Sequence, residues 1–501
     1  MKRDFKPAVI YATMAATHQD LRTIWGARFR DVAKNTNLTG KSVLCAYNAV
    51  VDYVEFVNPH LISQLVSKSG GEKEIWLSSM RELDHVENGY EFLSALIHSM
   101  REGKAMHFIC KNPALFEWFN KVFSGPDKKK MGGQAGIIAN QLCELGVNAV
   151  VWTPRLSRHL AELFHYARVK VPVAKGKKLV LRPAMKAYDK EASTKVNWIF
   201  EFKANDSLEM GGKKVVVPRS NRLIIASEAK IIPTFSDDLV PVLPALGKSV
   251  QAAILAGYHY LDPVCTESGK TCKYYLDRET ENIRALRKLN KNLFIHYEYV
   301  PIPHPEVEKR IISSIVPQID SLGLNEVEAR YLLEHFGYKN EAARIQKYEN
   351  AFTLYVGAAK LLNKLGLKRI HLHNLGYHLV LLKKPCRVPP EKARDACLFS
   401  SAVGAAKALK GGFVSKKDVI EASQLPLSDT GMNHVYAFAS YLITELKLQK
   451  GVFSPRQFHA EGIVDLGDHY AIVTPSPIIA KPVTTVGLGD AVSSAALAAE
   501  L

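Results

Sequence analysis

The chain has 501 residues, a hydrophobic content of 47% and a formal net charge of +17, from 66 Lys and Arg against 49 Asp and Glu. This composition is that of a globular protein and excludes the disordered and collagen-like classes, while the length favours two domains over one. No apolar run reaches the ~18 residues that a membrane span needs, so no membrane association is expected.

The positive charge favours anionic ligands such as nucleotides and sugar phosphates, although nucleic acid is an alternative. The basic residues are spread along the chain, and the densest run, Lys128-Lys129-Lys130, has no interleaved aromatics. No nucleic-acid partner is therefore expected. The seven cysteines are scattered without any Cys-x-x-Cys pair, which predicts reduced thiols and a cytoplasmic location. The sequence leaves a monomer and a small homo-oligomer equally open.

Helices are expected in residues 1–40, followed by a continuous apolar strand at Ser42–Tyr47. Asn48 and Asp52 come directly after this strand, where an open α/β sheet presents its ligand contacts. A turn with capping side chains is the alternative. Further on, Gly132-Gly133-Gln134 forms a loop that opens a helix. The alternation of strand and helix predicts a mainly parallel, doubly wound α/β sheet.

Between about 170 and 230 the pattern changes to short strands separated by polar turns, such as Val196–Phe202 and Leu223–Ile225. This pattern predicts a small β-rich insertion, such as a lid on the main domain. The insertion carries Lys195, Asn197 and Arg222.

The alternation returns after residue 249, and two carboxylates stand at the ends of its segments. Glu298 follows a buried strand, and Glu328 lies where a loop opens a helix. Carboxylate oxygens are what Mg²⁺ prefers, so both are candidates to hold it, with solvated surface carboxylates as the alternative.

Three histidines, His371, His373 and His378, are close enough in sequence to suggest zinc. However, no cysteine or acidic residue stands at ligand spacing. Packing or ligand contact is therefore favoured over a metal site.

A glycine-rich stretch near the end of the chain carries the clearest chemistry. Gly487, Leu488, Gly489 and Asp490 follow a buried strand and precede helix-compatible small residues. Free N–H groups and the dipole at a helix start attract an anion, and Asp490 could remove a proton from an attacking hydroxyl. The alternative is an ordinary turn with Asp490 as the N-cap.

These motifs, taken in order, resemble the ADP-dependent sugar kinases, the phosphofructokinase/glucokinase family of the ribokinase-like superfamily. The resemblance runs from about Val43 to Ser494. It is carried by Ala46-Tyr47-Asn48-Ala49-Val50-Val51-Asp52, Gly132-Gly133-Gln134-Ala135-Gly136-Ile137-Ile138-Ala139-Asn140, Lys195-Val196-Asn197, Gly257-Tyr258-His259, His296-Tyr297-Glu298, Asn325-Glu326-Val327-Glu328 and Thr485-Val486-Gly487-Leu488-Gly489-Asp490.

The resemblance implies a large Rossmann-like domain (1–50, 109–175 and 230–501) and a lid that closes over sugar (51–108 and 176–229). It implies that Asp490 is the catalytic base beside an anion hole at Gly487, Leu488 and Gly489. The other implied roles are sugar contact by Asn48, Asp52, Gly132, Gly133 and Gln134, nucleotide contact by His373, Tyr377, Val486 and Gly489, and a magnesium shell organised by Glu298 and Glu328 with Asp490.

The same resemblance favours fructose 6-phosphate over glucose as the phosphoryl acceptor. The glucokinases of the family carry a glutamate where Ala105 stands here, and Lys195, Asn197 and Arg222 match positions that bind the 6-phosphate. A second arginine expected near 228 is replaced by Glu228, with Arg219 and Lys230 close by, and Glu87 and Glu91 reach the sugar if the alignment slips. The expected activity is an ADP-dependent 6-phosphofructokinase that yields AMP; a glucokinase, a bifunctional enzyme and a non-catalytic binding protein are the alternatives.

Overall fold

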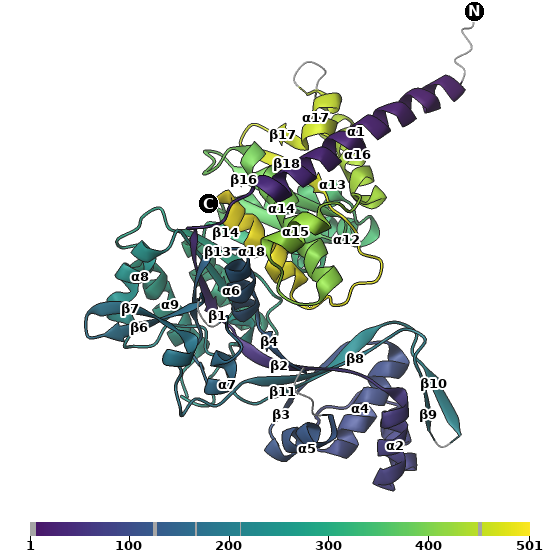
Figure 1. The fold of residues 1–501 in the computed structure, drawn as a ribbon, viewed down its shortest axis with the longest axis vertical. Coiled ribbons are helices and arrows are strands. Elements are labelled where there is room, and N and C mark those ends of the chain that lie inside the picture. Colours follow the sequence, from purple (N-terminus) through teal and green to yellow (C-terminus); the bar gives the residue numbers. More distant parts are fainter. Residues whose placement is uncertain (1–6, 124–127, 166–167, 211, 449–452) are drawn as a thin grey trace, which may run out of the picture.

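The computed structural model describes residues 7–123, 128–165, 168–210, 212–448 and 453–501. Its larger domain is built on an 11-stranded sheet, and its smaller domain on a 5-stranded sheet with a 2-stranded ribbon beside it. Figure 1 shows the smaller domain below the larger one, joined by thin connections. The doubly wound α/β architecture with a smaller lid, which the sequence predicts, is confirmed.

The large sheet has the strand order β17-β18-β16-β15-β14-β13-β12-β1-β5-β6-β7. The strands from β15 to β6 in this order are parallel, and antiparallel strands extend the sheet at both edges. The strands are β1 (Ser42–Tyr47), β5 (Asn148–Trp152), β6 (Lys170–Lys175), β7 (Lys178–Pro183), β12 (Ala252–Ala256), β13 (Phe294–Glu298), β14 (Ser321–Leu324), β15 (Arg369–Asn374), β16 (Tyr377–Lys383), β17 (Ile463–Asp465) and β18 (His469–Pro475).

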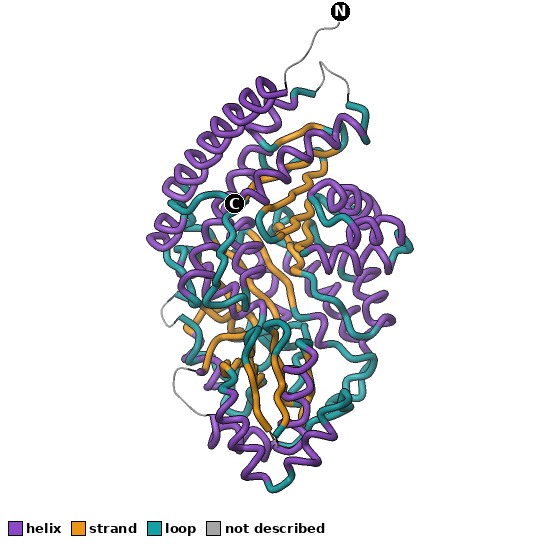
Figure 2. Tube along the Cα trace, turned by 90° about the vertical axis from the view of Figure 1, so that its right-hand side faces the viewer, coloured by secondary structure: helices purple, strands orange, loops and turns teal. Residues whose placement is uncertain are grey.

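Helices cover both faces of this sheet, as the edge-on view of Figure 2 shows. One face packs against α6, α14 and α18, and the other against α11, α13 and α16. The helices outside the lid are α1 (Pro7–Asn35), α6 (Gln134–Glu144), α7 (Arg158–Ala161), α8 (Leu243–Ser249), α9 (Cys272–Leu286), α10 (Pro305–Ser314), α11 (Glu326–His335), α12 (Lys339–Lys347), α13 (Ala351–Leu365), α14 (Pro390–Lys410), α15 (Lys416–Ala422), α16 (Asp429–Thr444), α17 (Pro455–Glu461) and α18 (Leu488–Glu500).

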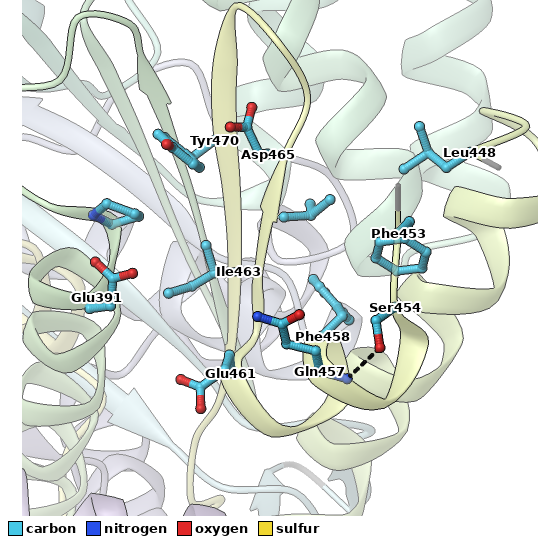
Figure 3. A pocket seen from close by; sticks show the side chains of 12 residues that line it. Glu391, Leu448, Phe453, Ser454, Gln457, Phe458, Glu461, Ile463, Asp465 and Tyr470 are labelled. Atoms are coloured by element: carbon cyan, nitrogen blue, oxygen red, sulfur yellow. Dashed lines mark hydrogen bonds between the residues drawn. The ribbon is translucent and has the colours of Figure 1, made fainter. Parts of the chain in front are cut away.

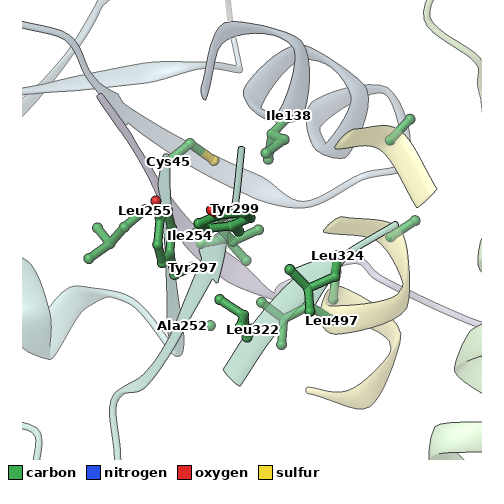
Figure 4. Packing of buried hydrophobic residues seen from close by; sticks show 14 of the residues in the cluster. Cys45, Ile138, Ala252, Ile254, Leu255, Tyr297, Tyr299, Leu322, Leu324 and Leu497 are labelled. Carbon is green, nitrogen blue, oxygen red and sulfur yellow. The ribbon is translucent and has the colours of Figure 1, made fainter. Parts of the chain in front are cut away.

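The core of the large domain lies where the central strands meet these helices (Figure 4). Because both faces of the sheet are covered, its strands are apolar without alternation, and Leu44, Ile254 and Leu322 are at most 1% exposed. Complete burial of such a side chain contributes roughly 1.5–3 kcal/mol. This packing fixes the ends of the strands, from which the polar side chains of the site project.

The lid has the strand order β3-β11-β8-β2-β4. One face of this sheet packs on helices through an aromatic cluster that includes Phe92, Phe119 and Phe200. The other face is open, and Phe56 (51%) and Ile109 (45%) on it are exposed. The elements are β2 (Val50–Phe56), α2 (Pro59–Ser69), α3 (Glu72–Ser78), α4 (Gly89–Glu102), β3 (Met106–Cys110), α5 (Pro113–Phe123), β4 (Lys129–Gly132), β8 (Val196–Phe202), β9 (Ser207–Met210), β10 (Lys213–Val216) and β11 (Asn221–Ser227).

Strand pairing corrects the domain boundaries expected from the sequence. Strand β4 was expected in the large domain, but it pairs with β2 of the lid sheet, and α5 packs under that sheet. Conversely, β7 was expected in the lid, but it pairs with β6 of the large sheet. The lid therefore runs from about residue 50 to 132 and from 196 to 227.

The backbone crosses between the domains at four places: at Asn48–Ala49, at Gly133, before Val196 and after Ser227. The crossings are hydrogen-bonded to one another. The N–H of Val51 donates to the carbonyl of Lys195 at 2.9 Å, the N–H of Val196 donates to Oγ of Ser227 at 2.9 Å, and the N–H of Ala135 donates to the carbonyl of Asn48 at 3.0 Å. These connections form one joint between the sheets.

Two local expectations differ from the structure. Asp52 lies within β2 of the lid, because the apolar run resumes at Val50 after a two-residue link. Residues Ser321–Leu324 form a buried strand, and the helix that they were expected to open begins only at Glu326. Asn325 between them is the N-cap.

Candidate active site

Helix α18 begins at Leu488, and Gly487 at its N-cap has φ +66°, a conformation that favours glycine. Asp490 therefore lies in the first turn of the helix, and the alternative of an ordinary N-cap is wrong. The first N–H groups of the helix have no intrahelical acceptor, and the helix dipole adds positive potential there. An anion can bind at this helix start beside the Asp490 carboxylate.

The loop before α18 separates two cavities. The first, a pocket of about 250 Å³, is lined by His373, Asn374, Leu375, Gly376, His378, Ser401, Gly404, Ala405, Ala408, Ser476, Pro477, Ile479, Pro482, Thr485, Leu488, Gly489 and Val492. The second, a cleft of about 360 Å³ between the domains, is lined by Asp52, Val54, Phe56, Lys129, Lys130, Met131, Ile137, Leu163, Glu201, Lys407, Gly411, Gly412, Phe413, Val483, Thr484 and Val486. The loop that leads into the helix thus lines both cavities, with Thr485 in the pocket and Thr484 and Val486 in the cleft.

Glu298, at the end of β13, is held by a buried network under α18. His296 lies 2.9 Å from one of its oxygens, His373 lies 2.9 Å from the other, and Ser493 of α18 donates to it at 2.5 Å. Burial opposes ionisation of this carboxyl, but the hydrogen bonds from the imidazoles outweigh it and lower its pKa to about 2. Burial likewise lowers the pKa of His373, yet Glu298, Glu328 and Asp490 raise it to about 9. The result is an ion pair in place before any ligand binds.

Glu328 and Asp490 stand in the opposite electrostatic situation. Burial and then the charge of Glu298 raise the pKa of Asp490 to about 7, and burial raises that of Glu328 to about 7. Glu328 also completes a capping box, because its carboxylate accepts from the N–H of Asn325 at 2.8 Å. Carboxylates that repel one another in this way favour a nearby cation.

On the lid side of the cleft, Asp52 is buried and accepts a hydrogen bond from the side chain of Asn197 at 2.9 Å. Burial raises the pKa of Asp52 to about 6, while Asn197 and Arg222 oppose that rise. Gly132 is required beside it, since a Cβ there would lie 2.1 Å from the carboxylate. These residues come together as the sequence predicts.

Asn48 lies where the first crossing meets the helix start at α6. Gly133, with φ +75°, passes so close that a Cβ would lie 2.5 Å from the carbonyl oxygen of Asn48. The side chain of Gln134, the first residue of α6, donates to the carbonyl of Glu298 at 3.3 Å. This contact ties the sugar-side loop to the buried carboxylate network.

Lys195 is buried at the third crossing, where its ammonium group donates to the carbonyl of Ser227. Burial, and then the charges of the nearby Lys230 and Arg155, lower its pKa to about 8, while Glu228 opposes them. A cluster of cations thus stands where a second arginine was expected. Glu228 is exposed, and Lys230 pairs with Asp262 at 2.8 Å.

Three sequence alternatives for the sugar side are placed elsewhere. Arg219 donates to the carbonyl of Gly103 at 2.7 Å, at the far end of the lid sheet. Glu87 accepts the N–H groups of Lys111 and Asn112 at 2.8 Å, so it orders the loop after β3. Glu91 in turn accepts the N–H of Glu87 at 2.7 Å.

On the nucleotide side, His373 and Gly489 line the pocket, and a Cβ on Gly489 would lie 3.0 Å from the imidazole. Val486 lines the cleft instead. Tyr377, expected in the same role, is 2% exposed, receives a hydrogen bond from Asn374 at 3.2 Å and does not line the pocket.

Comparison with known proteins identifies the chain. The family model "ADP-specific Phosphofructokinase/Glucokinase conserved region" matches residues 41–499. The chain belongs to this family.

Relatives in the family include two ADP-specific phosphofructokinases. The one from Methanosarcina acetivorans is 34% identical over 91% of this chain and 92% of its own length. The one from Pyrococcus furiosus is 31% identical over 90% of this chain and 95% of its own length. A solved structure of an ADP-dependent kinase in complex with fructose 6-phosphate and ADPβS superposes with a TM-score of 0.78, at 32% identity, over 95% of this chain and 97% of that one.

Several pocket residues of this ADP-dependent kinase were missed by sequence reasoning. Ser401 and Gly404 come from α14, and Ser476 and Pro477 from the loop after β18. They lie far apart in the chain and form no motif, so only the packing of α14 beside α18 reveals them.

Two of the three histidines near the pocket, His371 and His378, have a partner that the sequence did not indicate. Ligand atoms of His371, His378 and Cys397 of α14 lie within 4.8 Å of one another, all in buried side chains. However, the Nε2 of His371 lies 3.3 Å from Nδ1 of His378, and Ser401 lies 3.3 Å from the other nitrogen of His378. Hydrogen bonds therefore satisfy these atoms of His378 without an ion.

A larger cavity lies away from the kinase site. It has a volume of about 560 Å³ and lies beside α17 and β17, where Figure 3 shows Glu461, Asp465 and Tyr470 on its wall. Two of its carboxylates are already paired, Glu461 with Arg28 and Asp465 with Lys384. In the described part of the chain, no helix combines the length and the apolar character that crossing a membrane requires.

Proposed function

We propose that the protein is an ADP-dependent 6-phosphofructokinase, which transfers the β-phosphoryl group of ADP to the 1-hydroxyl of fructose 6-phosphate. The observation that carries this proposal is the position of the loop that leads into α18, because its residues line both a pocket of about 250 Å³ and a cleft between the domains that Lys129, Lys130 and Lys407 also line. The activity for which the relatives are named supports it, and so does the fructose 6-phosphate bound in the solved kinase complex.

In this reaction the 1-hydroxyl oxygen forms a bond to the β-phosphorus while the bond from that phosphorus to the bridging oxygen breaks. AMP leaves with the electron pair of the broken bond, and the hydroxyl proton passes to Asp490. The free N–H groups at Gly487–Gly489 stabilise the charge on the transferred group, since phosphoryl transfer depends mainly on positioning and charge stabilisation. Closure of the lid over the cleft excludes water that would otherwise accept the phosphoryl group.

We further propose Mg²⁺ as the cofactor, which would neutralise charge on the ADP phosphates. The carboxylate oxygens of Glu298, Glu328 and Asp490 are of the kind that such an ion prefers. Besides burial, Glu298 and Asp490 both raise the pKa of Glu328, and Glu298 raises that of Asp490, so the three groups are close enough to interact. They are not a compact ligand set: in the described segments, the only cluster of three ligand atoms within 4.8 Å is the His371 group. Each carboxylate oxygen of Glu298 also has an imidazole partner already. The residues therefore suit an ion that keeps most of its water.

The choice of fructose 6-phosphate over glucose rests on the lid. Arg222 lies on the open face of β11, and Lys195 lies at the neighbouring crossing. Their positive charges can pair with a near-dianionic phosphate. Ala105 leads into β3 on the same side of the sheet and offers glucose no carboxylate acceptor. The seven free thiols accord with a reducing, cytoplasmic setting.

A coupled assay that crosses ADP and ATP with fructose 6-phosphate and glucose tests the proposal. We expect turnover with ADP and fructose 6-phosphate to exceed every other pair by at least tenfold in kcat/KM. Equal use of glucose would indicate a bifunctional enzyme, and preference for ATP would contradict the assigned donor.

A further inference from the structure

Lys407 is a buried lysine in the last turn of α14, and neither the motifs nor the proposed mechanism accounts for it. Its side chain is 4% exposed and lines the cleft between the domains. Its ammonium group donates to the carbonyl of Gly412 at 3.2 Å and lies 4.8 Å from the ring centre of Phe413.

This ammonium group makes no ion pair within 4.0 Å with any carboxylate that the structure describes. The two buried arginines do have such partners, since Arg369 pairs with Glu500 at 2.7 Å and Arg394 pairs with Glu461, whereas Lys195, the other buried lysine, has no carboxylate partner in the described chain. A buried cation without a counter-ion destabilises the fold unless a partner compensates it. The wall of a ligand cleft is where such a partner can arrive with the substrate.

The neighbours of Lys407 identify where that partner would be. Lys407 lines the cleft together with Thr484 and Val486 of the loop that leads into α18. One turn earlier on α14, a Cβ on Gly404 would lie 2.7 Å from Val492 of α18. The chain after α14 also touches the anion-binding loop, since the N–H of Val483 donates to the carbonyl of Ala408 at 2.7 Å. Lys407 therefore stands on the cleft side of the Gly487–Asp490 segment.

We propose that Lys407 is a catalytic residue whose ammonium group contacts the phosphoryl group as it passes from ADP to the sugar. This proposal rests on the proposed function. The helix start of α18 supplies N–H groups to the transferred phosphoryl group, and Lys407 supplies a full positive charge from the wall of the cleft. The low polarity around Lys407 makes that charge worth more than it would be in water.

The test compares Lys407→Met, which keeps length and removes charge, with Lys407→Arg, which keeps the charge. We expect Lys407→Met to lower kcat about 10²–10³-fold, the loss typical of one charge-stabilising donor, while KM for both substrates changes less than threefold. Lys407→Arg should recover at least a tenth of wild-type kcat. Lys410→Met, at the exposed end of the same helix where Lys410 pairs with Asp418, is the matched control and should keep wild-type turnover.

Ligand binding separates this role from a structural one. The probe is AMP with aluminium fluoride and fructose 6-phosphate, which mimics the phosphoryl group in flight. Lys407→Met should bind this set at least tenfold more weakly than the wild type, yet bind AMP alone and fructose 6-phosphate alone normally. Normal affinity for the aluminium fluoride set would overturn the proposal. So would a joint loss of all three affinities with a lowered Tm, because it would assign Lys407 to folding.

The binding test of Lys407→Met can be interpreted whatever the activity assay of the wild-type protein shows. If the wild-type protein fails to phosphorylate fructose 6-phosphate with ADP, the proposed function falls. The affinity of Lys407→Met for AMP with aluminium fluoride, measured with whichever sugar the wild type accepts, still decides the role of Lys407.

Discussion

The end of the large sheet and the open face of the lid sheet prepare for their ligands in different ways. At the large sheet, Glu298 is fixed by three partners and His373 is held against Gly489 before any substrate is present. On the lid, the open face leaves Phe56 and Ile109 exposed, with Arg222 on the same face. The groups at the large sheet are therefore preorganised, and under the proposed function we expect recognition of the sugar to be completed when the lid closes over the cleft.

The two regions also differ in charge. Carboxylates gather at the large sheet, whereas the cations Lys195, Lys230 and Arg222 gather on the lid and on the connections that flank it. Loss of a group at the large sheet should therefore lower kcat, and loss of a group on the lid should raise KM. The predictions that follow test this division.

The largest effect is expected at Asp490. Asp490→Asn removes only the proton acceptor, so turnover should fall about 10²-fold or more while binding of ADP and fructose 6-phosphate stays nearly intact. Steady-state kinetics and calorimetric binding measure the two parts. A variant that keeps more than a tenth of wild-type turnover would show that Asp490 is not the base.

On the lid, Arg222→Ala should raise the KM for fructose 6-phosphate by roughly ten- to a few hundred-fold, because a charged hydrogen bond contributes ~1.5–3 kcal/mol. Turnover at saturation should change little. Arg219→Ala is the matched control, since Arg219 is bound to the carbonyl of Gly103 at the far end of the sheet. Equal effects of the two variants would remove Arg222 from the sugar site.

Glu328 tests whether the large sheet needs a cation. Glu328→Gln should raise the magnesium concentration for half-maximal activity by about tenfold, the lower end of the effect of outer ligands. The capping hydrogen bond to Asn325 can persist through the amide oxygen. Glu334→Gln, exposed on the same helix, should leave the magnesium titration unchanged. An unchanged titration of the Glu328 variant would make that carboxylate structural.

The smallest effect concerns stability, at a carboxyl outside the site. Glu279 of α9 is 0% exposed and accepts a hydrogen bond from the hydroxyl of Tyr47. Burial raises the pKa of its carboxyl group from 4.5 to about 8. Between pH 4.5 and 8 the folded state keeps this proton and the unfolded state has lost it. Stability from this group is thus full below pH 4.5 and declines as pH rises toward 8.

Glu279→Gln cannot ionise and should remove that decline. We expect the fall in Tm between pH 5 and pH 8 to shrink by about 1–3 °C in the variant, as measured by calorimetry. Glu281→Gln, exposed on the same helix, should follow the wild type. The same fall in Glu279→Gln as in the wild type would assign the pH dependence to other groups.

Sequence patterns predict the fold class well, because buried parallel strands such as β1 and β12 are short, continuous apolar runs that can be recognised locally. The domain boundaries could not be predicted, because the domain to which β4 and β7 belong is decided by the strand with which each pairs, and composition does not show that partner. The glycine-rich motif located Asp490, since helix starts have a local signature. Lys407 and the pocket residues of α14 carry no such signature, because their roles depend on contacts between distant segments.

The four crossings described above carry a mechanical consequence. A single connection lets two bodies twist and slide, but four that are hydrogen-bonded side by side resist everything except bending about one line. Asn48, Gly133 and Lys195 stand on these crossings, so the sugar contacts that the proposed function assigns to this region would act on the joint itself. We expect a bound sugar to change the stiffness of the joint as well as its angle.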